Sequence, residues 1–152
     1  MAANIKQRLV KPGRDFNYAE GVKVLNKSGA EIAANKIVYV TGHEGVFMTV
    51  ELAANGTAAS LRGRLHITKH AIPNNGYGVV LPWKLVTGLN NADPNGAPGA
   101  TGDTLYLGAS GGWTKTKGAG RVIGQVVTAG TGAATTDGAI VFTGEGAFNI
   151  EP

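Results

Sequence analysis

The chain has 152 residues, a net charge of +4 and 24 glycines, with 43% hydrophobic and only 16% charged residues. Cysteine is absent, which excludes disulfides, thiolate metal sites and a cysteine nucleophile. The length fits one domain with its own core, and the low charge argues against wholesale disorder. No apolar run reaches the roughly 18 residues of a membrane-spanning helix, so we expect no membrane partner.

The first twenty residues differ from the rest and predict an extended basic arm, residues 1–20. Four basic residues precede the first acidic one, Asp15, and Pro12 biases Lys11 away from a helix. The segment has no apolar core of the kind found in a secretory signal. We expect this arm to fasten the chain to a partner. Its candidate contacts are four basic residues and one apolar anchor: Lys6, Arg8, Leu9, Lys11 and Arg14.

From Gly21 onward the sequence is a series of short apolar runs separated by glycine-rich turns. This pattern predicts that residues 21–152 form one all-β domain, a small Gly-rich antiparallel β-barrel or β-sandwich. The expected strand regions are 21–32, 36–42, 45–53, 61–69, 78–86, 102–108, 121–130 and 138–144.

The clearest strand pattern lies at residues 61–69, where apolar and polar residues alternate with a period of two. A half-buried strand is expected there. We predict that Leu61, Leu65 and Ile67 point inward and that Arg62, Arg64 and His66 point outward. A second alternation predicts one shared face for Val46, Met48, Val50 and Leu52.

Turn chemistry divides these runs. Asn26–Gly29 and the Asn75-Gly76 pair favour tight turns, and Asp103 and Asp137 stand beside glycine, where aspartate commonly closes a turn. Residues 89–101 form the longest expected loop, and loops of this length are usually functional. We therefore treat it as a second candidate contact.

None of the residue patterns predicts an enzyme or a cofactor. His43-Glu44 is not followed by the second histidine of a zinc-protease motif. His66 and His70 are four apart, but on a strand that spacing does not bring them together. The glycines of 118–124 are wrongly spaced for a dinucleotide loop and lead into a strand. We expect no catalytic, cofactor-binding or metal-binding residues.

Two features favour contact with a protein. The row Arg62, Arg64 and His66 is first interpreted as a solvated face and second as a site for an acidic protein partner. Nucleic acid is not expected, because aromatic side chains do not accompany this row. Trp83 follows Pro82, which indicates an edge strand. Core filling is its default role, and a subunit contact is the next interpretation.

Two long segments carry a resemblance to a known family. In GDTLYLGASGGWTKTKGAGRVIGQVVTAG (102–130) a Gly-Asp strand ends in Leu-Tyr-Leu, a Gly-Gly turn with a tryptophan follows, and the next strand contains Ile-Gly-Gln-Val-Val. DGAIVFTGEGAF (137–148) comes after it. These segments resemble the decoration, or cement, proteins of tailed-bacteriophage heads. Residues 36–86 are also similar, so the resemblance covers about residues 21–150.

The resemblance implies a structural role. Such proteins are small β-barrel-like modules on the outside of an expanded capsid, often trimers near threefold positions, and they have no catalytic site. The chain is therefore expected to bind the major capsid protein and other copies of itself on the virion exterior. A receptor- or carbohydrate-binding β domain of a phage fibre is the alternative, and it would need exposed aromatics lining a groove. An unrecognised enzyme is the third possibility.

Overall fold

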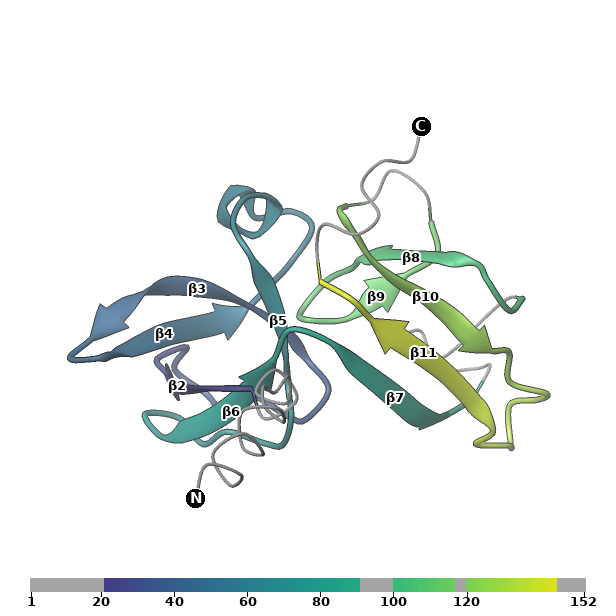
Figure 1. Cartoon of the computed structure of the whole chain (residues 1–152), viewed down its shortest axis with the longest axis horizontal. Coiled ribbons are helices and arrows are strands. Elements are labelled where there is room, and N and C mark those ends of the chain that lie inside the picture. Colours follow the sequence, from purple (N-terminus) through teal and green to yellow (C-terminus); the bar gives the residue numbers. More distant parts are fainter. Residues whose placement is uncertain (1–20, 91–99, 117–119, 145–152) are drawn as a thin grey trace, which may run out of the picture.

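A computed structural model of the chain describes residues 21–90, 100–116 and 120–144. Within them the protein is all-β, as predicted, and consists of a closed barrel followed by an open five-stranded sheet. Figure 1 shows these two parts side by side. The predicted arm, residues 1–20, lies outside the described residues.

The barrel takes the first half of the chain. Its strand order is β2-β4-β3-β5-β6, in which β2 and β4 are parallel and the other neighbours are antiparallel. A short 3-10 helix, η1, stands between β4 and β5. The elements are β2 (Val22–Asn26), β3 (Ile37–Glu44), β4 (Phe47–Leu52), η1 (Ala58–Leu61), β5 (Leu65–Thr68) and β6 (Tyr77–Leu81).

The open sheet takes the second half. Its order is β7-β11-β10-β8-β9, all antiparallel, so β7 and β9 are its edge strands. The strands are β7 (Lys84–Leu89), β8 (Thr104–Leu107), β9 (Trp113–Thr114), β10 (Val122–Thr128) and β11 (Gly138–Phe142).

The barrel has an apolar interior of its own. Four of its strands each contribute one fully buried valine to this cluster. Ile32 and Ile72, which pair in an isolated β-bridge, belong to the same cluster. At Gly78 the chain passes so close to Ile72 that an added Cβ would lie 2.4 Å from its side chain. A larger residue there would displace the barrel interior, because protein cores have little free volume. The valines are Val24, Val38, Val50 and Val80.

A second core joins the barrel to the sheet. The outer faces of β3, β5 and β6 pack against the inner face of the sheet in one buried cluster. The barrel contributes Ile37, Leu65, Ile67 and Leu81, and the sheet contributes Val86, Leu105, Leu107, Trp113, Ile123, Val126, Ile140 and Phe142. Both faces of β5 are therefore buried, since one faces the barrel interior and the other faces the sheet.

The structure corrects part of the prediction for residues 61–69. Leu65 and Ile67 are buried as predicted, and Arg62 and Arg64 are exposed. His66 is buried, not outward, because it pairs with Val38 and shares that residue's side of the sheet, the barrel interior. The prediction was also wrong for Leu61, which ends η1 and is 42% exposed.

The second alternation is confirmed in part. Val50 is buried, and Met48 and Leu52 pack against the barrel core. Val46 does not share their position, because it lies in the β3–β4 turn and is 90% exposed.

The predicted turns form as their residues suggest. The Asn26 Oδ1 accepts the N–H of Ser28 at 2.9 Å, and Asn75 adopts a φ of 62°. The Asp137 carboxylate accepts hydrogen bonds from the hydroxyl and the backbone N–H of Thr131. These two bonds, together with a weaker contribution from the Thr135 hydroxyl, lower the pKa of the carboxyl to about 2.

Polar contacts also connect the two parts. The Nη1 of Arg121, just before β10, donates to the carbonyl oxygen of Ser60 in η1 and to those of Arg62 and Gly63 in the η1–β5 connection. Lys84 of β7 donates its Nζ to the Asn35 side chain and to the carbonyl of Thr68. Burial, and then the nearby charge of Lys69, lower the pKa of Lys84. The two parts are thus held by directional bonds as well as by apolar packing.

Candidate interaction surface

Trp83 lies on the surface where the barrel passes into the sheet. β6 ends at Leu81 and β7 begins at Lys84, so Pro82 and Trp83 form the connection between them. Trp83 is 59% exposed, so the default prediction of core filling was wrong and the contact interpretation remains. Leu85, two residues later, is 48% exposed. We call Trp83 and Leu85 the β7 edge patch.

The position of this patch matters because β7 is the edge of the open sheet. An edge strand presents backbone groups that can bind another chain, and proteins usually protect such edges with charge or proline. The charge of β7 is on Lys84, whose ammonium group is engaged with Asn35 and Thr68. The edge strand and the connection before it therefore present one aliphatic side chain, Leu85, and one large aromatic side chain, Trp83.

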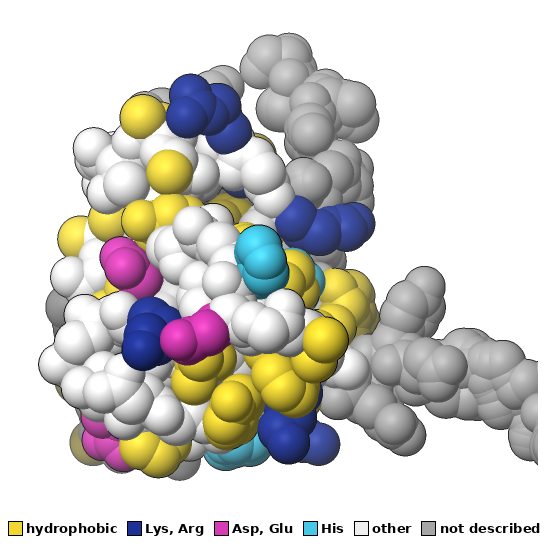
Figure 2. Space-filling model, turned by 90° about the vertical axis from the view of Figure 1, so that its left-hand side faces the viewer, with side chains coloured by type: hydrophobic (Ala, Val, Ile, Leu, Met, Phe, Trp, Pro, Cys, Tyr) yellow, Lys and Arg dark blue, Asp and Glu magenta, His cyan; other side chains and the backbone are white. Residues whose placement is uncertain are grey.

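A second exposed cluster was not predicted from the sequence. Phe47 and Tyr77 meet edge to face with ring centroids 4.9 Å apart, and the Lys23 Nζ lies 5.6 Å and 5.3 Å from their centroids. The three residues come from β4, β6 and β2, which are neighbours in the barrel. Figure 2 shows hydrophobic side chains gathered in one area of the barrel end, with basic side chains at its border. Only the strand order could reveal this cluster.

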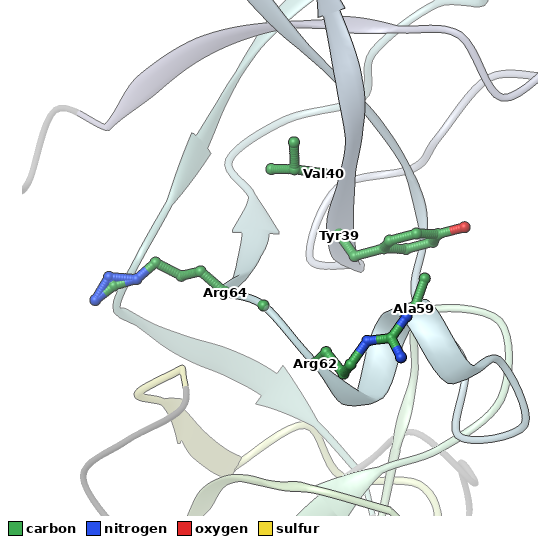
Figure 3. Close-up of a pocket in the computed structure, with 6 residues that line it drawn as sticks. Tyr39, Val40, Ala59, Arg62 and Arg64 are labelled. Atoms are coloured by element: carbon green, nitrogen blue, oxygen red, sulfur yellow. The ribbon is translucent and has the colours of Figure 1, made fainter.

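A shallow pocket of about 150 Å³ opens between β3 and the η1–β5 connection. Its lining residues are Tyr39, Val40, Ala59, Arg62, Gly63 and Arg64. In Figure 3 the Arg62 guanidinium turns toward Ala59 and the Tyr39 ring, whereas Arg64 extends in the opposite direction. The predicted basic row is therefore divided: Arg62 and Arg64 both line the pocket but extend in opposite directions, and His66 is buried.

The His66 side chain lies in the barrel interior rather than on the surface. It is 7% exposed, and its Nδ1 has no hydrogen-bond partner among the described residues. Burial, and then the charge of Arg64, lower the pKa of this imidazole. His70 lies apart on an exposed turn, with its Nδ1 3.0 Å from the Ala71 carbonyl oxygen. No three metal-binding side chains gather anywhere in the described ranges.

The remaining predicted contacts cannot be placed. Lys6, Arg8, Leu9, Lys11 and Arg14 lie outside the described residues, as does most of the 89–101 loop.

No helix in the described part of the chain is long and apolar enough to cross a membrane. No protein-family model, curated protein or solved structure matches the chain.

Proposed function

We propose that the chain is a structural virion protein that binds the outside of a phage capsid and stabilises it by bridging neighbouring capsid subunits. The observation that carries this proposal is the β7 edge patch, in which Trp83 is 59% exposed although the adjoining cores are filled. Tryptophan is prominent among the residues that dominate protein interfaces. The resemblance of residues 21–150 to capsid decoration proteins names the partner.

The patch supplies enough apolar surface for a binding anchor. Covering the exposed part of Trp83 removes on the order of 100 Å² from water. At about 25 cal/mol per Å², that area contributes roughly 2–3 kcal/mol before the costs of association. Several copies on one capsid, or several contacts per copy, would multiply this effect.

A bridging role also requires a module that resists deformation. The shared core, the Arg121 contacts and the Lys84 contacts hold barrel and sheet together at separate points. The basic arm of residues 1–20 would add a second attachment. Its charge would steer the approach to an acidic capsid surface, while Leu9 and its apolar neighbours would slow dissociation. Self-association, as a trimer, belongs to the same proposal.

Carbohydrate or receptor binding ranks second. Exposed aromatics favour it, because Tyr77 is 50% exposed. The Phe47–Tyr77 pair meets edge to face beneath Lys23, so it offers no open flat platform for a sugar ring. The described pocket is lined by a single aromatic, Tyr39.

The test is binding to heads of the source phage that have been prepared without this protein. Co-sedimentation and electron microscopy should show saturable binding and a regular lattice of added density. Trp83→Ala should weaken binding by about tenfold or more, as expected for an aromatic anchor. Val127→Ala is the matched control, since Val127 is also an exposed apolar residue of the sheet, at 38%. Full-length protein that does not bind heads would refute the proposal.

Deleting residues 1–14 tests the arm separately. The truncated protein should melt at nearly the same temperature and bind heads more weakly, because the arm is too short and polar to hold a core. Replacing Lys6, Arg8 and Lys11 with glutamate should mainly slow association and reduce its salt dependence. Equal binding by truncated and full-length protein would remove the arm from the interface.

A further inference from the structure

The pocket between β3 and η1 combines hydrogen-bond donors with an apolar wall. Its charged donor is the guanidinium of Arg62, which turns toward Ala59 and the Tyr39 ring (Figure 3) and makes no side-chain hydrogen bond or ion pair within the described part of the protein. Among residues 21–90, 100–116 and 120–144, no acidic side chain lines the pocket. Val40 and Ala59 supply aliphatic surface. The pocket is therefore suited to an acceptor group carried on an apolar stem.

Hydrogen bonds from Arg121 hold the backbone segment that carries Arg62. Arg121 donates to the carbonyl oxygens of Ser60, Arg62 and Gly63 at 3.3, 3.2 and 2.6 Å, which holds the backbone on both sides of Arg62. Gly63 adopts a φ of 70°, a conformation that glycine reaches without strain. Because the backbone of this segment is fixed before any ligand arrives, less conformational freedom is lost on binding.

The chemistry of the lining narrows the class of ligand. One guanidinium beside aliphatic and aromatic surface suits the end of a glutamate side chain, in which a carboxylate follows methylene groups. Arginine pairs with carboxylate through two parallel N–H bonds. An inorganic phosphate would have the same charge complementarity but would make no use of the Val40 and Ala59 wall.

We propose that this pocket binds the carboxylate side chain of an acidic residue on the protein partner, with the guanidinium of Arg62 as the donor. The inference rests on the proposed function for the partner's identity, and on the pocket alone for the ligand's chemistry. Glu51 stands opposite Tyr39 in the β3–β4 register and does not line the pocket.

The direct test is a titration of the full chain followed by amide NMR. The probes are glutamate blocked at both ends, the equally blocked glutamine, and inorganic phosphate, all at one ionic strength. Glutamate should shift the signals of Tyr39, Arg62 and Gly63 in a saturable way, and glutamine should not. Arg62→Gln should weaken glutamate binding by at least about tenfold, since a hydrogen-bonded charge is lost.

Lys115→Gln is the matched control, because it removes the same charge from an exposed residue that does not line the pocket. Its effect should stay within about twofold, as exposed charges are screened. Equal effects of the two substitutions, or no shifts with glutamate, would overturn the proposal. Shifts with phosphate alone would overturn the carboxylate assignment.

Binding to heads then separates this inference from the proposed function. Arg62→Gln should bind heads more weakly than Lys115→Gln. If heads bind all three proteins equally and glutamate causes no shift, the pocket assignment is wrong and the capsid function stands. If glutamate binds but heads do not, the capsid function is wrong and the pocket assignment stands.

Discussion

The Nη1 of Arg121 lies 2.6 Å from the carbonyl oxygen of Gly63, although the two residues are 58 positions apart. Arg121 precedes β10 of the sheet, and Gly63 lies just before β5 of the barrel. A charged donor in this position satisfies carbonyl groups that the end of η1 leaves without helical partners. The contact therefore couples the stability of the connection to that of the sheet.

Replacing Arg121 with glutamine should lower the free energy of unfolding by about 1.5–3 kcal/mol, the usual worth of hydrogen bonds to a charged group. Urea denaturation measures this change. Arg64→Gln, which removes an exposed arginine outside this contact, should stay within about 0.5 kcal/mol. Similar losses for the two variants would mean that Arg121 acts only through general charge.

Truncating Leu65 to alanine should cost roughly 2–5 kcal/mol, because its side chain is 1% exposed and lies in the core shared by barrel and sheet. Leu61→Ala makes the same chemical change at a residue that is 42% exposed, and should cost far less. Thermal or urea unfolding of both variants checks the difference. A loss below about half a kcal/mol for Leu65→Ala would show that the core is misplaced.

Gly124→Ala should destabilise the sheet by about 1–3 kcal/mol, the usual cost of overpacking. A Cβ at Gly124 would lie 1.9 Å from the carbonyl oxygen of Val141, so β10 and β11 would have to move apart. At Gly132 the nearest heavy atom to an added Cβ is 4.0 Å away, which makes Gly132→Ala the control. Unfolding midpoints that fall equally in both variants would contradict the close pairing.

Stability should fall as the pH drops below about 6.5, the ordinary pKa of histidine. Burial and the charge of Arg64 lower the pKa of His66, so the unfolded chain takes up this proton before the folded chain does. The loss should continue until the pH passes the folded-state pKa and then stop. Urea titrations between pH 8 and pH 5 measure it.

His66→Gln should reduce that pH dependence, and His70→Gln, at an exposed turn, should leave it in place. A pH profile unchanged by His66→Gln would assign the effect to other groups. The comparison is informative because the slope of stability against pH counts the protons that the two states bind differently.

The sequence by itself determined the all-β class and several turns, whereas the run predicted at 78–86 is divided between β6 of the barrel and β7 of the sheet. Alternation at Leu65 and Ile67 predicted two buried residues, and Asn26, Asn75 and Asp137 predicted turns that form through their own side-chain bonds or φ angles. These features depend on neighbours within a few positions of the chain. Local sequence therefore contains enough information to predict them.

Only the tertiary structure decided which surfaces are free. His66 is buried because the barrel closes around one face of β5 while the sheet covers the other. An alternation of apolar and polar residues predicts one buried and one exposed face, so it could not reveal that both faces of this strand are buried. Trp83 is exposed because both cores are filled by other residues, and the Lys23 cluster exists because β2 lies between β4 and β6. Such outcomes depend on pairings between distant segments, and long-range packing overrides local pattern wherever several elements compete for the same apolar surface.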